Sequence, residues 1–263
     1  MALRGRPLPP IRIGTSGWSY AHWRGAFYPQ GLPPRRWLEY YLQFFRSVEI
    51  NGSFYRLVPE HTLIQWRDSV PDDFLFAMKG SRYITHMTRL KRPQGLQHFM
   101  ERAVLLGDKL GPILFQLPPR WQLNMERLEG FFETLPKQHR FAMEFRDPTW
   151  WVPEVYDLMA RYRVAFCIFE LSGLYSPLQI TTDFAYVRLH GPGGPYQGRY
   201  TDAALARWAG LFKGWRRGGL AVYCYFDNDQ AGYAAQDAQR LQALVGARAG
   251  ARRAVRPRRG RRA

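Results

Sequence analysis

The sequence contains only two cysteines, Cys167 and Cys224, in 263 residues. Two thiols are too few for a disulfide framework or for a zinc site built from cysteines alone. Each cysteine lies within a run of apolar and aromatic residues, which is typical of a buried free thiol. The cysteine content therefore excludes the disulfide-rich class of small secreted proteins.

Long apolar runs are also missing. No stretch approaches the ~18 apolar residues that a membrane-spanning helix needs, and the first residues, MALRGRPLPPIRIG, lack the apolar core of a secretory signal. We therefore expect a cytoplasmic protein that has no membrane partner.

Acidic residues are scarce, with 21 Asp and Glu against 38 Lys and Arg and a net charge of +17. Residues 248–263, RAGARRAVRPRRGRRA, hold eight arginines and no acid, which leaves +9 for the rest of the chain. This tail has too little apolar surface to offset the entropy of ordering it, so we expect it to be disordered. We also expect it to attract nucleic acids non-specifically and in a salt-dependent way.

The rest of the composition is that of a globular protein, with 46% hydrophobic and 22% charged residues. Short segments rich in β-branched and aromatic residues alternate with amphipathic stretches. The predicted strands are Ile11–Ser16, Ser47–Asn51, Leu75–Lys79, Ile113–Leu117, Phe141–Phe145, Val164–Phe169, Ala185–His190 and Ala221–Phe226. The predicted helices are Pro34–Phe45, Leu96–Leu110, Met125–Leu135, Pro153–Arg163, Ala203–Arg216 and Ala234–Val245.

Eight strands separated by helices, in a chain of this length, predict a single (β/α)8 TIM barrel. A doubly wound open sheet would also alternate, but it needs fewer strands. The segment between the sixth and seventh strands is short, which predicts one shortened crossover without a full helix. We expect an N-terminal extension over 1–10, the barrel over 11–247 and the basic tail over 248–263.

The catalytic face of such a barrel is the rim formed by the carboxyl ends of its strands. Polar side chains stand at nearly every predicted strand end, namely Glu49, Asn51, Lys79, Gln116, Glu144, Arg146, Glu170, Arg188, His190, Asp227, Asn228 and Asp229. Charged groups inside a barrel are costly unless they are paired or belong to a functional mouth. The alternative to a functional site is a structural layer of ion pairs, such as Glu49 with Lys79 and Glu144 with Arg188.

The residue types suggest roles at this rim. Glu49 and Glu144 are predicted to be the acid/base pair, His190 to move a proton, and Lys79 to stabilise negative charge or, with a lowered pKa, to form a Schiff base. The predicted substrate-binding residues are Asn51, Gln116, Arg146, Arg188, Asn228 and Asp229, together with Gly193 and Gly194, whose N–H groups would bind an anion before the helix that begins near Thr201.

The sequence has no nucleotide-cofactor fingerprint, no phosphate-binding loop and no nucleophile elbow. The cofactor is therefore unknown. A divalent metal stays open but is not favoured, because no tight ligand spacing such as H-E-x-x-H occurs. Its candidate ligands are His22, His86, His190, Glu49, Glu144, Glu170 and Asp229.

Several motifs resemble the YecE-like family, known as domain of unknown function 72. They are GTSGWSYAHWRGAFYP, VEINGSFYRL, MKGSRYITH, LLGDKLGPILFQLPPRW, MEFRDPTWW, YVRLHGPGGPYQGRY and VYCYFDND, which occur in this order between about residues 11 and 246. The resemblance implies a (β/α)8 barrel and places the strand-end residues on the family's motif positions. The family usually has Asn at position 227 and Asp near Glu170, and it has no assigned reaction.

From these features we expect an enzyme of hydrolase or lyase type that acts on a small anionic substrate, phosphorylated or nucleotide-like. Two alternatives remain at the level of the sequence. One is a nucleic-acid-binding protein or a metal-dependent nuclease-like barrel. The net charge favours it, and so do the aromatic residues after the first predicted strand, Trp18, Tyr20, Trp23, Phe27 and Tyr28. The other is a barrel that binds a small ligand without catalysis.

Overall fold

The structure, a computed structural model, describes residues 7–246. Residues 1–6 and 247–263, which include the predicted tail, lie outside the described residues. The strands are β1 (Ile11–Thr15), β2 (Ser47–Ile50), β3 (Leu75–Lys79), β4 (Leu110–Gln116), β5 (Phe141–Glu144), β6 (Val164–Leu171), β7 (Leu174–Tyr175), β8 (Phe184–Leu189) and β9 (Ala221–Phe226).

All strands except β7 are parallel and neighbour one another in the order β1-β9-β8-β6-β5-β4-β3-β2. The two ends of this order meet where Ser16 and Glu49 form a parallel bridge and the N–H of Gly17 donates to the carbonyl of Glu49 at 2.8 Å. The sheet thus closes on itself, and the predicted barrel is confirmed.

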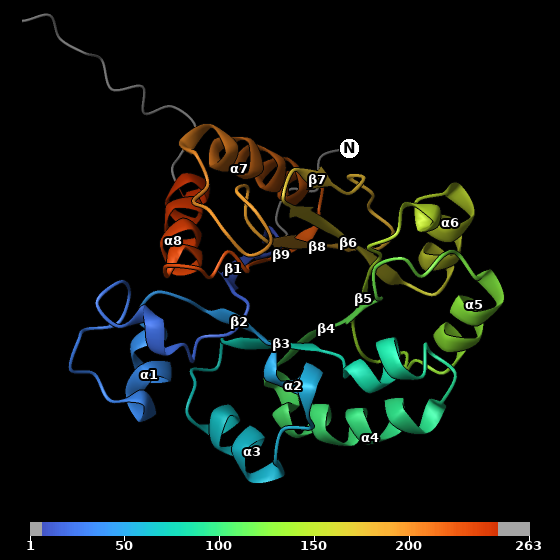
Figure 1. The fold of residues 1–263 in the computed structure, drawn as a ribbon, viewed down its shortest axis with the longest axis horizontal. Coiled ribbons are helices and arrows are strands. Elements are labelled where there is room, and N and C mark those ends of the chain that lie inside the picture. Colours follow the sequence, from blue (N-terminus) through green and yellow to red (C-terminus); the bar gives the residue numbers. More distant parts are fainter. Residues whose placement is uncertain (1–6, 247–263) are drawn as a thin grey trace, which may run out of the picture.

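The helices form a ring around the strands (Figure 1). They are α1 (Trp37–Tyr41), α2 (Gly52–Tyr55), α3 (Glu60–Asp68), α4 (Pro93–Ala103), α5 (Met125–Glu133), α6 (Pro153–Arg161), α7 (Asp202–Arg217) and α8 (Tyr233–Gly246). Prolines begin α4 and α6, while Asn124 and Thr201 cap α5 and α7 by accepting hydrogen bonds from backbone N–H groups. No helix within residues 7–246 is long and apolar enough to cross a membrane.

Several helical segments differ from the prediction. The expected helix Pro34–Phe45 is a 3-10 turn, Pro34–Arg36, followed by the short helix α1, and α2 was not expected. The expected helix Leu96–Leu110 ends at Ala103 and continues as a 3-10 segment with a positive φ at Gly107, so β4 begins already at Leu110. Helix α3 was not expected, because Leu63 is its only fully buried residue and its apolar pattern is correspondingly weak.

The crossover between β6 and β8 carries no helix, as predicted. It contains β7, which pairs antiparallel with β6. Near the end of the crossover, Thr181 is hydrogen-bonded to the start of β6. Its hydroxyl donates to the carbonyl of Val164 at 2.6 Å and accepts from the N–H of Phe166 at 2.9 Å. This short connection satisfies backbone groups at the start of β6 without a helix.

The side chains divide into two buried layers according to strand alternation. A large layer between strands and helices holds most Phe, Leu, Ile and Trp side chains. The barrel interior is smaller and contains Ala77, Leu114, Ala142, Ala165, Cys167, Phe184, Tyr186, Ala221, Tyr223 and Tyr225. The lumen side chains of β3 to β6 are small or aliphatic, whereas those of β8 and β9 are mostly aromatic. The alternation of side chains along each strand also determines which strand-end residues face the mouth.

Candidate active site at the barrel mouth

The interior-facing positions at the carboxyl ends of the strands carry the charged residues. Glu49 lies two residues after Ser47 on β2, Lys79 follows Ala77, Glu144 follows Ala142, and Arg188 follows Tyr186. Register aligns Gln116 with Glu144 on neighbouring strands. Alternation thus brings most of the predicted residues into one layer above the apolar lumen.

Arg188 is the centre of this layer and is completely buried. Its Nη2 lies 2.8 Å from Glu49 Oε1 and 3.1 Å from Asp227 Oδ2, while its Nη1 lies 3.0 Å from Glu144 Oε2. One guanidinium therefore neutralises carboxylates from three different strand ends. The hydroxyl of Tyr186 donates to the other oxygen of Glu49 at 2.6 Å. This satisfied network offsets the cost of burying the charges.

Glu144 binds a second guanidinium through Arg146, whose Nε donates to Oε1. Burial alone would raise the pKa of Glu144, but the charges of Arg146 and Arg188 outweigh it and hold the pKa well below the usual range. Glu144 and Glu49 are both inaccessible to solvent. Both carboxylates were predicted to exchange protons. Glu144 is instead an ionised partner of two arginines, and Glu49 is a buried hydrogen-bond acceptor.

His190 joins the network through both ring nitrogens. Nδ1 lies 3.0 Å from Asp227 Oδ2, and Nε2 lies 3.1 Å from Arg146 Nη2. Because a guanidinium can only donate, Nε2 accepts and the ring proton sits on Nδ1, directed at Asp227. Burial raises the pKa of Asp227, but the hydrogen bond from His190 and the charge of Arg188 lower it more, so its pKa is below the usual value.

Lys79 differs from its neighbours. Its side chain is 8% exposed, and its Nζ makes no hydrogen bond or ion pair with any residue in the described part of the chain. The Nζ lies 4.4 Å from the centroid of the Phe54 ring. Burial and then the charge of Arg188 lower the pKa of Lys79 to about 8, against the smaller opposing effects of nearby carboxylates. The ion pair expected with Glu49 is not formed.

Other polar groups on the same side of the mouth also lack partners among residues 7–246. The Asn51 Oδ1, on the β2 side, is buried without a hydrogen bond. The Gln116 amide, on β4, and the Arg146 Nη1, after β5, have no hydrogen bond within the described chain. Together with Lys79, these groups form the open side of the mouth, which we define as Asn51, Lys79, Gln116 and Arg146.

Some predicted residues lie away from this layer. Glu170 points outward, where its carboxylate accepts from Trp208 Nε1 at 3.4 Å. Asn228 bonds the carbonyl of Gly198 and Asp237, both at 2.9 Å. Asp229 accepts from Trp23 Nε1 at 2.6 Å and so holds the first loop.

The glycine loop after β8 forms a tight turn. The N–H of Gly193 donates to the carbonyl of Gln197 at 3.2 Å, and the carbonyl of Gly194 accepts from the N–H of Gln197 at 3.1 Å. The N–H of Gly193 is thus already engaged within the loop. Among the described residues, neither glycine forms a hydrogen bond with Arg188 or with the carboxylates that Arg188 binds.

Sequence reasoning passed over three residues of the site. Asp227 was noted at a strand end but not chosen, although Tyr223 and Tyr225 face the lumen and parity therefore directs Asp227 inward. Ser16 donates to Glu49 and accepts from Arg188 Nη2 at 3.1 Å. Tyr186 had no signal of its own, since an interior tyrosine and a core tyrosine look alike in sequence.

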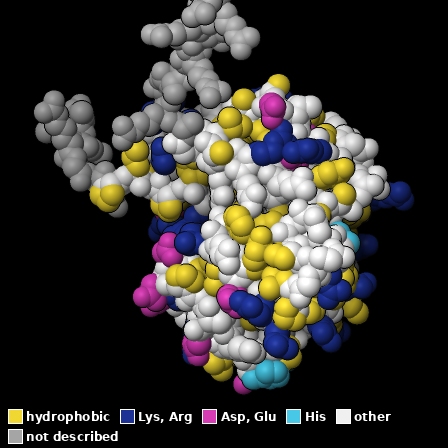
Figure 2. All heavy atoms as spheres, turned by 90° about the vertical axis from the view of Figure 1, so that its left-hand side faces the viewer, with side chains coloured by type: hydrophobic (Ala, Val, Ile, Leu, Met, Phe, Trp, Pro, Cys, Tyr) yellow, Lys and Arg dark blue, Asp and Glu magenta, His cyan; other side chains and the backbone are white. Residues whose placement is uncertain are grey.

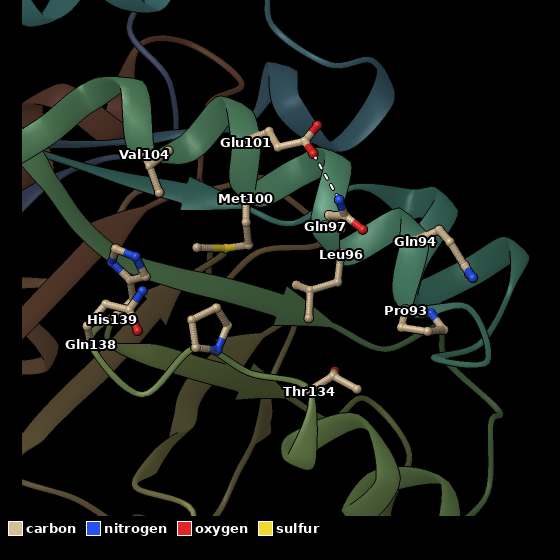
Figure 3. Close-up of a pocket in the computed structure, with 11 residues that line it drawn as sticks. Pro93, Gln94, Leu96, Gln97, Met100, Glu101, Val104, Thr134, Gln138 and His139 are labelled. Atoms are coloured by element: carbon tan, nitrogen blue, oxygen red, sulfur yellow. Dashed lines mark hydrogen bonds between the residues drawn. The ribbon is translucent and has the colours of Figure 1, made fainter.

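Within residues 7–246 there is no group of three or more His, Cys, Asp and Glu side chains arranged to hold a metal ion. A groove of about 580 Å³ lies on the outside of the barrel, between α4 and the segment after α5. Its walls are Leu96, Met100 and Val104 on one side and Thr134 and His139 on the other (Figure 3). None of the predicted site residues lines it.

The outer surface gives no comparable concentration of functional groups in the view of Figure 2. On that face, Lys and Arg side chains are scattered among apolar ones, with acidic side chains in a few places (Figure 2). The layer of buried charged residues at the barrel mouth is the candidate site. Fold and site together place the chain in the class of parallel β/α barrel proteins with a charged layer at the strand ends.

The sequence model described as "Protein of unknown function DUF72" matches residues 12–261, so the chain belongs to the DUF72 family. It is 29% identical over 140 residues to the UPF0759 protein YecE of Escherichia coli and 27% identical over 157 residues to the UPF0759 protein YunF of Bacillus subtilis. These matches cover 52% and 56% of this chain. The chain spans about half the length of these relatives, 49% and 54% respectively.

Solved structures agree with this assignment. A DUF72 family protein from Thermotoga maritima superposes with a TM-score of 0.82 at 27% identity, covering 90% of this chain and 99% of that one. A DUF72 family protein from Enterococcus faecalis gives 0.76 at 19% identity, covering 91% and 96%, and supports the fold alone. The resemblance found in the motifs is thus confirmed, and it brings no reaction with it.

Proposed function

We propose that the barrel mouth is the active site of an enzyme that binds a small anionic substrate and acts on it by acid/base chemistry of hydrolase or lyase type. The observation that carries the proposal is the state of Lys79, a nearly buried amine without a hydrogen-bond or ion-pair partner among the described residues. A structural ion-pair layer would have paired this charge, since unpaired buried charges are costly.

The open side of the mouth supplies donors for an anion. The ammonium of Lys79 and the Nη1 of Arg146 can donate hydrogen bonds to the oxygens of a carboxylate or phosphate. Such charge-assisted hydrogen bonds are stronger than those between neutral groups. Gln116, on the strand between them, adds an amide that can donate or accept. An anionic substrate would satisfy these groups together.

The roles within the site follow from exposure. Lys79, with a pKa of about 8, exchanges a proton near neutral pH. Glu49, Glu144 and His190 are fully buried and hold the two arginines in place. This assignment moves the proton-transfer role from the glutamates, where the sequence analysis placed it, to the lysine.

The test is a substrate screen with matched variants. Wild-type protein, Lys79→Met and Lys137→Met are each incubated with a pooled mixture of sugar phosphates and nucleotides, and consumption is followed by mass spectrometry. Lys137 is exposed and lies after α5, away from the mouth. We expect at least one compound to be consumed by the wild type and Lys137→Met, and about a hundredfold more slowly by Lys79→Met.

Two results would contradict the proposal. Equal consumption by Lys79→Met and the wild type would place the reaction elsewhere. Binding of an anion without any turnover would make the protein a non-catalytic ligand-binding barrel.

A further inference from the structure

The amine of Lys79 stands out because every other interior-facing charged group at the mouth has a partner among the described residues. Arg188 pairs with three carboxylates and Arg146 with Glu144, while the His190 ring is hydrogen-bonded to Asp227. Lys79 instead rests against the face of Phe54. An amine that makes no ion pair keeps its lone pair free for bond formation whenever it loses its proton.

We infer that Lys79 forms an imine with an aldehyde or ketone that also carries a carboxylate or phosphate group. This inference rests on the proposed function, because it takes the same mouth as the anion-binding site and names the substrate class. The neutral Nζ attacks the carbonyl carbon and the C–N bond forms. The carbonyl oxygen leaves as water, taking the two protons that the nitrogen gives up, so no oxidant or reductant is required.

The arrangement of the strands supports a bifunctional substrate. Lys79, Gln116 and Arg146 come from or directly follow three consecutive strands, β3, β4 and β5. The charges of Lys79 and Arg146 both act on His86, so the two side chains lie around one region of the mouth. A carbonyl carbon at Nζ and an anionic group at the free Nη1 of Arg146 can therefore belong to one small molecule, with the Gln116 amide between them.

The environment also keeps part of the amine neutral. Burial and the charge of Arg188 lower the pKa of Lys79, while the carboxylates of Glu144, Asp227 and Glu49 oppose this. His86, from the π-helical turn Tyr83–Met87, faces the same region, and burial together with the charge of Lys79 lowers its pKa to about 4. His86 is thus neutral at physiological pH and adds no charge beside the amine.

The experiment uses glyoxylate, a small anionic aldehyde, with sodium cyanoborohydride, which delivers hydride to an imine and fixes it as a secondary amine. Wild-type protein is treated at pH 7, digested, and the labelled lysines are located by mass spectrometry. The extent of labelling is compared among the five lysines of the chain, Lys79, Lys91, Lys109, Lys137 and Lys213. We expect Lys79 to be labelled on the order of a hundredfold faster than Lys137, as a pKa near 8 in place of 10.5 implies.

A parallel reaction with acetaldehyde, a neutral aldehyde, separates the two parts of the inference. We expect acetaldehyde to label Lys79 at least tenfold more slowly than glyoxylate, relative to Lys137 in each case. Calorimetric titration of the wild type, Lys79→Met and Lys137→Met with oxalate, a non-reactive dianion, measures the anion site independently.

The outcomes distinguish a failure of the imine from a failure of the proposed function. Oxalate binding that depends on Lys79, without preferential glyoxylate labelling of Lys79, would overturn the imine and leave the proposed function standing. Equal labelling of Lys79 by both aldehydes, with no oxalate binding, would overturn the anionic substrate class and the proposed function. Absence of both effects would overturn both claims.

Discussion

Arg188 and Glu49 meet across the interior of the barrel, with Nη2 2.8 Å from Oε1 and both side chains excluded from solvent. They come from β8 and β2, which are not neighbours in the sheet. The contact therefore spans the lumen at the mouth and links the two sides of the barrel. It also fixes the guanidinium whose charge acts on Lys79.

Arg188→Met is expected to destabilise the fold strongly, because it leaves three carboxylates buried without their shared cation. The loss should be about 3 to 5 kcal/mol in the free energy of unfolding, measured by urea denaturation. The matched control is Arg161→Met, which breaks the exposed pair with Glu129 and should change stability by less than about 1 kcal/mol. A change for Arg188→Met no larger than that of the control would show that the network does not hold the barrel.

Stability should fall in acid through Glu144. The folded pKa of this carboxyl lies below its unfolded value of about 4.3, so its contribution is present above that value and is lost as the pH falls through the folded pKa. Glu144→Gln should be less stable than the wild type at pH 7, and the difference should shrink as the pH falls to 3. Urea denaturation across this range measures it. A difference that stays constant with pH would contradict the lowered pKa.

Strand alternation explains how much of this site the sequence could predict. The residues at or near the carboxyl ends of strands with a clear apolar pattern could be assigned to the interior, namely Glu49, Lys79, Gln116, Glu144 and Arg188. Of the two ion pairs considered from the sequence, Glu144 with Arg188 is formed, whereas Glu49 meets Arg188 rather than Lys79. Which pairs form depends on where the strands lie around the closed barrel, and the sequence pattern does not show this.

The ends of the last strands were harder to predict. Asp227, Asn228 and Asp229 are consecutive, and the position where β9 ends decides which of them faces the mouth. Glu170 follows the same logic, because Ala165 and Cys167 face the lumen and parity turns Glu170 outward. A shift of one residue reverses the direction of a strand side chain, and sequence patterns rarely fix a strand end that closely.

Gly14→Ala should disrupt the closure of the barrel. A Cβ at this position would lie 2.1 Å from the carbonyl oxygen of Ser47, and backbone cannot move aside as a flexible side chain can. We expect a loss of at least about 2 kcal/mol from the displaced strand contact, seen as a lower midpoint of thermal unfolding. Gly130→Ala, in α5 with open space around it, is the control and should be neutral or stabilising. Similar midpoints for both variants would contradict the tight approach of β1 and β2.

Nucleic-acid binding is expected to depend on residues 248–263. Removing these residues takes away eight arginines and should weaken binding to a non-specific DNA duplex. The affinity rises with the number of phosphates that the protein neutralises, because each neutralised phosphate releases counterions. Gel-shift titrations of the full chain and of residues 1–247 at two salt concentrations measure this. Unchanged affinity after truncation would instead place a nucleic-acid surface on the barrel and favour the nucleic-acid-binding alternative.

Whether Lys79 is a desolvated amine in an anion site is measured most directly by NMR titration of protein labelled with ¹³C at the lysine Cε. The Lys79 resonance is assigned by its loss in Lys79→Met. We expect a midpoint near pH 8, which moves upward when oxalate is added because a bound anion favours the ammonium form. A midpoint near 10.4, the ordinary value for lysine, that oxalate does not move would show that Lys79 is neither desolvated nor part of an anion site.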